Sequence, residues 1–232
     1  MNELGTVYAA CRERITEVVG QVGPKAKETM VPTCPAWTVH DLLAHVVGSA
    51  DDVTARRLEG APGEAWTANQ VEIRRARTTE EVLAEWESLS PAMEQMINEG
   101  VHRGPIHFRL EEAATSDAVS HEHDIRGALG LPGARDSKAV PVGIAFYAHN
   151  RIEAAAAHGV SLRVCVTDGT VFGDADASVT ITGEPWELLR ALAGRRNPEQ
   201  LRKLAWTGDA DTVIPLFGRP GALTTPTDPI DE

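Results

Sequence analysis

The sequence predicts an α plus α+β fold, in which an N-terminal four-helix bundle precedes a small C-terminal α+β domain. Before residue 160, apolar residues recur with helical spacing in several long segments. From Val160 the spacing changes to the alternation of apolar and polar residues that is typical of strands, around an Asp-Gly turn. The length of 232 residues and the 42% hydrophobic content suit one large or two modest globular domains.

The first two predicted helices flank a segment that contains two prolines. Helical spacing covers residues 3–22 and is ended by a Gly-Pro pair. The following segment, "VPTCPAW", lacks this spacing, so we expect an ordered loop. Thr38 and Asp41 have the spacing of a capping box, which predicts that a second helix covers residues 39–59.

Three further helices are predicted after a polar stretch. Thr79 is expected to cap the third, which ends at Gly100 and which Pro91 could kink or split. The fourth should cover residues 108–129, because a Gly-Leu-Pro sequence closes it. The fifth is predicted over residues 140–159.

The remaining chain is expected to form a small sheet with short helices. The stretch "SLRVCVTDGTVFGDADASVTIT" alternates as paired strands do, "EPWELLRALAG" and "DTVIPLFG" resemble short helices, and "KLAWTG" between them resembles a strand. We therefore expect a helical domain at residues 1–150, a small α+β domain at 151–223 and a polar, disordered tail at 224–232.

The composition argues against several classes of protein. A net charge of −12 does not suit binding to nucleic acid or anionic lipid, because neutralising phosphates needs an excess of lysine and arginine. No apolar run is long enough to cross a membrane and the N-terminus lacks the layout of a signal peptide. We therefore expect a cytoplasmic monomer or small homo-oligomer with no membrane partner. The three cysteines have no CxxC spacing, which argues against a disulfide framework or a cysteine zinc site.

The predicted fourth helix places polar side chains on its apolar face. On a helical wheel, Asp117 and His121 lie within the arc of Ala114 and Ile125 and are stacked one turn apart. Buried polar groups need partners, and a buried carboxylate needs a positive charge or a metal. His45, at the edge of an apolar stripe on the predicted second helix, is a third candidate ligand.

His45, Asp117 and His121 form the two-imidazole, one-carboxylate set of metal sites that leave a position open for water or substrate. The structural alternative is a hydrogen-bonded core pair of Asp117 and His121 with a partly exposed His45. Asp124 could orient a histidine as its hydrogen-bond partner, or it could be a surface acid. His123 projects roughly 160° away from His121 on a helix, so the two cannot share an ion.

Two stretches resemble the mycothiol-dependent maleylpyruvate isomerase family, namely "VPTCPAWTVHDLLAHVVG" and "HEHDIRGALG". The N-terminal domain of that family belongs to the DinB-like metal-binding four-helix bundles. The C-terminal part of this chain resembles the family's small sterol-carrier-like domain. The family's motif residues correspond here to Cys34, Trp37, Asp41, His45, Asp117, His121 and Asp124.

The resemblance implies a divalent metal ion on His45, Asp117 and His121. Zinc is expected first, and nickel, iron and manganese also suit this ligand set. The family usually has Glu where this chain has Asp117, so the shorter side chain would need an ion nearer its helix or would act through water. The resemblance also places an arginine near the metal, here Arg195, which would bind a substrate carboxylate. The alternative for Arg195 is a surface charge at a helix end.

The function that the resemblance implies is that of an actinobacterial metal-dependent enzyme that uses mycothiol or a similar thiol. The metal would lower the pKa of the thiol, and the thiolate would attack a small electrophilic substrate in S-transfer or cis-trans isomerisation. Two alternatives stay open: a non-catalytic module that binds a small ligand or a partner, and a metal-dependent hydrolase that uses metal-bound water. Cys34 has no neighbouring base in the sequence, so we expect packing roles for it and for Trp37.

Overall fold

The computed structural model describes residues 3–22, 28–100, 110–218 and 226–232, and its contacts divide the chain into two compact units. The first unit comprises residues 1–133 with Glu232, and the second comprises residues 134–231. The first is helical and the second combines helices with a sheet, which confirms the predicted fold class. The division by contacts falls before the fifth long helix, whereas the sequence analysis places a domain boundary near residue 150.

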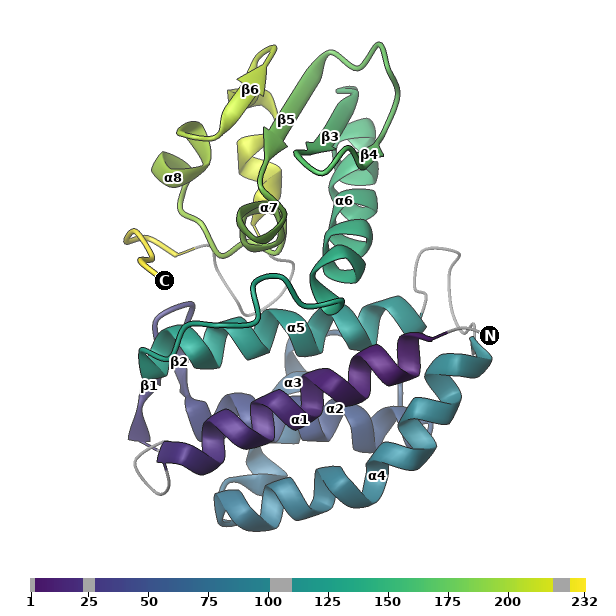
Figure 1. Ribbon diagram of the computed structural model, residues 1–232, viewed down its shortest axis with the longest axis vertical. Helices are drawn as coiled ribbons and strands as arrows, with labels where there is room; N and C mark the ends of the chain where they lie inside the picture. Colours follow the sequence, from purple (N-terminus) through teal and green to yellow (C-terminus); the bar gives the residue numbers. More distant parts are fainter. Residues whose placement is uncertain (1–2, 23–27, 101–109, 219–225) are drawn as a thin grey trace. The chain divides into compact units, whose positions relative to one another are not determined.

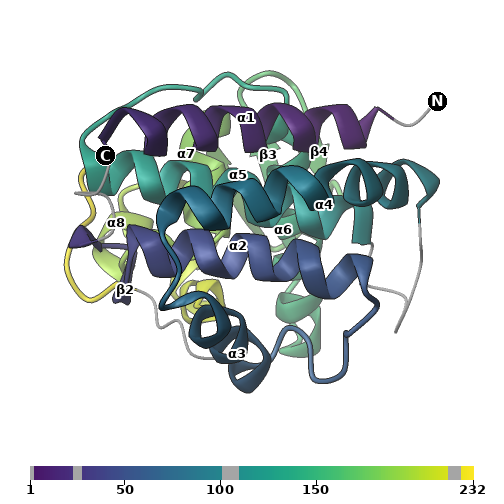
Figure 2. The ribbon, with the colours of Figure 1, turned by 90° about the horizontal axis from the view of Figure 1, so that it is seen from below.

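Four long helices form the first unit: α1 (Leu4–Val22), α2 (Val39–Thr54), α4 (Thr79–Glu99) and α5 (Leu110–Leu129). α1 and α2 each pack against both α4 and α5, and Figure 2 shows the four helices running alongside one another. A shorter helix, α3 (Glu64–Arg74), packs on α2. The apolar faces meet in a core that includes Ile15, Leu42, Val46, Trp86, Met93, Ile97, Val119 and Ile125. In the described residues, no helix combines the length and the apolar character that a bilayer span needs.

Threonine side chains start α2 and α4. The Thr38 hydroxyl accepts a hydrogen bond from the Asp41 N–H at 3.1 Å, and the Asp41 carboxylate accepts one from the Thr38 N–H at 3.0 Å. This confirms the predicted capping box. At α4 the cap is Thr78 rather than Thr79, because Glu81 lies three residues after Thr78 and completes the same box.

The first unit differs from the sequence-based expectation in three places. α2 ends earlier than residue 59, because the backbone at Arg56 turns to a left-handed conformation with φ of 62°. The expected proline loop contains a hairpin of β1 (Met30–Val31) and β2 (Cys34–Thr38). The polar stretch after α2 forms α3.

The helix α4 continues through Pro91 and is not split there. The expected start of the fourth predicted helix, at residue 108, lies outside the described residues.

The second unit contains a mixed sheet of β3 (Leu162–Val166), β4 (Val171–Phe172), β5 (Val179–Gly183) and β6 (Ala205–Thr207), in the order β4-β3-β5-β6. The central strands β3 and β5 are parallel, and the edge strands β4 and β6 pair antiparallel to them. α6 (Ala139–Ala157) packs on α7 (Pro185–Leu192) and on β3 (Figure 1). At the predicted turn, Gly169 has φ of 98°, a conformation that glycine adopts without strain. The remaining elements are α8 (Pro198–Arg202) and the 3₁₀ turns η2 (Ala210–Thr212) and η3 (Ile214–Phe217).

Residues 226–231 contact α8 instead of forming the free tail that the sequence analysis expects. The Gln200 side chain donates a hydrogen bond to the Ile230 carbonyl at 2.9 Å and accepts one from the Ile230 N–H at 3.1 Å. Asn197 donates to the Thr227 carbonyl at 3.3 Å. These bonds order the segment after residue 225, whereas residues 224 and 225 lie outside the described residues.

Candidate metal centre

His45 of α2 comes together with Asp117 and His121 of α5 inside the first unit. One carboxylate oxygen of Asp117 lies 3.6 Å from His45 Nε2, and the other lies 3.3 Å from His121 Nε2. One ligand atom from each of the three residues lies within 4.8 Å of the others. Ligand atoms bound tetrahedrally at about 2.0–2.1 Å from a zinc ion lie roughly 3.3 Å apart. The distances of 3.6 and 3.3 Å between the Asp117 oxygens and the two Nε2 atoms therefore suit a shared cation. We call these three residues the His-Asp cluster.

Hydrogen bonds fix the direction of both imidazole rings. His121 Nδ1 lies 2.9 Å from an Asp124 carboxylate oxygen, and His45 Nδ1 lies 2.8 Å from Gln70 Oε1. Both partners accept, so each Nδ1 can donate a proton, and a neutral ring with its proton on Nδ1 directs its Nε2 lone pair toward Asp117. Histidines that bind metals have this arrangement, in which the second ring nitrogen donates to an oxygen. The residues present therefore fit a divalent ion.

Asp124 is a buried partner of His121 and not a surface acid. Its side chain is completely buried, and its other oxygen accepts a hydrogen bond from the Thr33 hydroxyl at 2.8 Å. The sulfur of Cys34 lies 4.0 Å from Asp124, at the limit of a weak hydrogen bond. Cys34, His121 and Asp124 also have ligand atoms within 4.8 Å of one another. Because Asp124 bonds to His121 Nδ1, we assign Asp124 to orienting the ring.

The electrostatics of the cluster favour a positive charge at its centre. Burial raises the pKa of Asp117, but the imidazoles of His121 and His45 lower it more, so its pKa lies well below the usual range. Burial lowers the pKa of His121, but Asp117 and Asp124 raise it more, so its pKa lies above the usual value. The ionised carboxylate between the two rings therefore attracts either a proton or a metal ion.

Asp117 is also the accessible member of the cluster. Its side chain is 37% exposed, whereas those of His45 and His121 are 9% and 3% exposed. The missing methylene relative to glutamate does not separate it from the histidines, because each of its oxygens faces a different ring. A small molecule would reach the cluster from the side of Asp117.

The other residues singled out in the sequence have separate positions. Trp37 is half-buried and is not a core residue, and its ring centroid lies 5.2 Å from that of His45. His123 is buried and is not a member of the cluster. Arg195 follows α7 in the second unit, where it is buried and donates to the Ala193 carbonyl at 2.6 Å. A role for Arg195 in substrate binding stays a prediction.

Three polar residues near the cluster were not predicted from the sequence: Gln70, Asp52 and Thr33. Gln70 lies on α3, which has little apolar periodicity, and Thr33 lies in the turn of the unexpected hairpin. A signal for Asp52 was present, because it lies seven residues after His45 and thus two turns along the same face of α2.

A second buried carboxylate on α5, Glu122, has arginine partners instead of histidines. Arg14 of α1 approaches it to 2.6 Å, and Arg126 approaches it to 3.0 Å. The Cys11 thiol lies 3.4 Å from the same carboxylate. Burial and then the charge of Glu122 raise the pKa of Cys11 far above that of a free thiol, so Cys11 is held as a neutral thiol.

The family model described as mycothiol maleylpyruvate isomerase N-terminal domain matches residues 8–126, just over half of the chain. Two solved structures are similar at 12% identity, each with 83% of this chain and 88% of the other chain covered. They are the mycothiol-dependent maleylpyruvate isomerase, with a TM-score of 0.54, and a mutant of it with one histidine replaced by alanine, with a TM-score of 0.60. The comparison with curated proteins finds no match. The structural likeness concerns the fold.

Proposed function

This chain belongs to the family of the mycothiol maleylpyruvate isomerase N-terminal domain, and we propose that it is a metal-dependent enzyme that activates a low-molecular-weight thiol of the mycothiol type. The observation that carries the proposal is the His-Asp cluster, in which two oriented imidazoles and one ionised carboxylate offer ligand atoms within 4.8 Å of one another. The expected ion is divalent, with zinc first and nickel, iron or manganese as chemically suitable alternatives.

The chemistry needs a thiolate at neutral pH. A divalent ion on His45, Asp117 and His121 would lower the pKa of a thiol bound beside it. The thiolate would then form a sulfur–carbon bond with a small electrophile. In S-transfer a leaving group departs with its electron pair, and in cis-trans isomerisation the new bond breaks again after rotation about the former double bond. Asp124 and Gln70 hold the protons on the two Nδ1 atoms throughout.

The cysteines of the chain support a separate thiol molecule as the nucleophile. Cys11 and Cys34 are completely buried, and the pKa of Cys11 is raised. Cys165 lies on β3 in the second unit. A thiol from solution can reach the exposed side of Asp117, whereas Cys11 and Cys34 have no exposed surface.

The metal content of the protein purified without an affinity tag tests the proposal. We expect one divalent ion per chain in the wild type and a loss of most of it in His121→Ala, because one of three ligands is removed. His158→Ala is the matched control, because His158 is exposed and bonds only to the helix carbonyl of Ala154 among the contacts described. Equal metal in the wild type and His121→Ala would contradict the ligand assignment.

Two further measurements separate the alternative functions. Turnover of small electrophiles that depends on added thiol supports the proposal, whereas equal hydrolysis without thiol supports a metal-dependent hydrolase. A protein that lacks metal and whose melting temperature is unchanged by a chelator would instead be a binding module that retains the bundle.

A further inference from the structure

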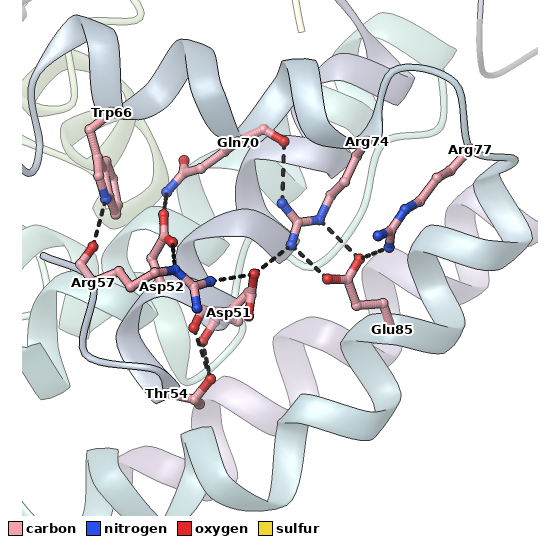
Figure 3. Close-up of polar contacts among 10 residues, drawn as sticks. Asp51, Asp52, Thr54, Arg57, Trp66, Gln70, Arg74, Arg77 and Glu85 are labelled. Carbon is pink, nitrogen blue, oxygen red and sulfur yellow. Dashed lines mark hydrogen bonds and ion pairs between the residues drawn. The ribbon is translucent and has the colours of Figure 1, made fainter.

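Polar side chains link His45 to the surface of the first unit through α3. Gln70 Oε1 lies 2.8 Å from His45 Nδ1, and Gln70 Nε2 donates to an Asp52 oxygen at 2.8 Å. The other oxygen of Asp52 accepts from Arg57 Nε at 3.0 Å, and the Arg57 side chain is 54% exposed. Figure 3 shows Gln70 directed from α3 toward Asp52, with Arg57 on the far side of that carboxylate.

We propose that Gln70, oriented by Asp52, is a positioning residue that holds the proton of His45 on Nδ1 and so directs its Nε2 lone pair at the metal position. The inference rests on the proposed metal site for its functional meaning. A carboxylate can only accept, so the Gln70 amide must turn its NH₂ group to Asp52 and its oxygen to His45. Without Asp52, the Gln70 amide could flip and present its NH₂ group to His45 Nδ1, which would favour a proton on His45 Nε2.

The packing of α2 and α3 makes this contact possible. His45, Gly48 and Asp52 lie on one face of α2, and Gln70 crosses that face above Gly48. A Cβ atom at position 48 would lie 2.5 Å from Gln70 Cβ, closer than side-chain atoms can approach. The glycine therefore lets Gln70 contact His45 on one side and Asp52 on the other.

α3 is attached to its neighbours by contacts that do not involve His45. Arg74, one turn after Gln70, lies 3.1 Å from Asp51 of α2 and 2.6 Å from Glu85 of α4. The Trp66 indole N–H donates to the Arg57 carbonyl at 3.1 Å. Figure 3 shows Arg74 reaching both carboxylates while Gln70 reaches Asp52. These contacts hold α3 on α2 and α4, in the position that the contact between Gln70 and His45 requires.

The first readout is the proton position on His45 in the metal-free protein. Nitrogen-15 NMR of the imidazoles, at a pH where the rings are neutral and with His45→Ala as the assignment control, should show the proton on Nδ1 in the wild type. In Gln70→Met, which keeps the side-chain length and removes the acceptor, and in Asp52→Asn, which frees the amide to turn, the Nε2 form should appear. Protonation of Nε2 in the wild type would overturn the proposal.

The second readout is affinity for Zn²⁺, measured by competition with a chromophoric chelator. Gln70→Met should bind about 10-fold more weakly, within the usual effect of removing the partner of a ligand histidine. Glu72→Gln is the matched control, because Glu72 is an exposed residue of α3 that pairs with Arg75, and its substitution should leave the proton on Nδ1. Unchanged affinity and proton position in Gln70→Met would overturn the proposal. If the proton positions are as expected but the wild type binds no metal, the metal site fails and the positioning role stands.

Discussion

His121 and His45 present the same ring nitrogen to Asp117 but are held in different ways. The partner of His121 is a carboxylate, Asp124, which lies one turn along the same helix and is completely buried. The partner of His45 Nδ1 is a neutral amide on a neighbouring helix, and the carboxylate on that side of the ring, Asp52, is one hydrogen bond further away. A bond to an ionised acceptor is stronger than a bond to a neutral one.

One half of the cluster, His121 with Asp124, is organised within α5. The other half, His45 with Gln70, depends on tertiary packing. The orientation of His121 follows from an i, i+3 spacing within α5, and the β1–β2 hairpin adds the bond from Thr33. The orientation of His45 exists only when α3 lies on α2 above Gly48. The His45 half should therefore be more sensitive to changes in packing, and the His121 half to changes in charge.

The largest effect is expected at Asp117, which both halves share. Asp117→Asn removes the charge between the rings and should weaken Zn²⁺ binding more than the loss of either hydrogen-bond partner does, by about 100-fold or more. Asp117→Glu, which introduces the usual residue of the family, should keep most of the affinity. Chelator competition measures both variants. An effect of Asp117→Asn smaller than that of Gln70→Met would show that the halves bind the ion independently.

The next largest effect is expected at Asp124. Asp124→Asn replaces the charged acceptor of His121 and should weaken Zn²⁺ binding by about 100-fold, near the upper end for such partners, whereas Gln70→Met should weaken it by about 10-fold. The ratio of the two affinities, measured in the same buffer, tests the comparison directly. A reversed order would mean that packing against α3 matters more than the carboxylate.

A smaller effect is expected for Gly48→Ala, which touches no ligand. The added methyl group would displace Gln70 and should weaken Zn²⁺ binding by about 3-fold, less than complete loss of the contact. Overpacking should also lower the free energy of unfolding by about 1–3 kcal/mol. Gly20→Ala is the control, because no atom lies within 4 Å of a Cβ there. Normal binding by Gly48→Ala would show that α3 can shift without loss of the contact.

The smallest effect on metal binding is expected for Glu122→Gln, on a different face of α5. The substitution leaves Arg14 and Arg126 without their buried carboxylate, and should lower the free energy of unfolding by about 3 kcal/mol. Zn²⁺ affinity of the folded protein should be unchanged. Urea denaturation and chelator competition measure the two quantities. A large loss of affinity would show that α5 transmits strain to the cluster.

The parts of the fold and site that local spacing determines were predictable from sequence. The Thr38–Asp41 box marks the start of α2, and the i, i+4 spacing places Asp117 and His121 on one face of α5. The hairpin and α3 were not predicted, because two prolines obscure the first and a polar composition obscures the second. Gln70 could not be assigned, since its contact with His45 depends on how α3 packs.

Trp37 gives the candidate site an optical consequence. Its indole ring is half-buried and its centroid lies 5.2 Å from that of His45, so we expect its fluorescence to respond to a charge at that imidazole. Binding of an ion at His45 would change the emission of an indole that the chain already carries, and Trp37→Phe would abolish this change. Filling of the site could then be followed in real time in unlabelled protein.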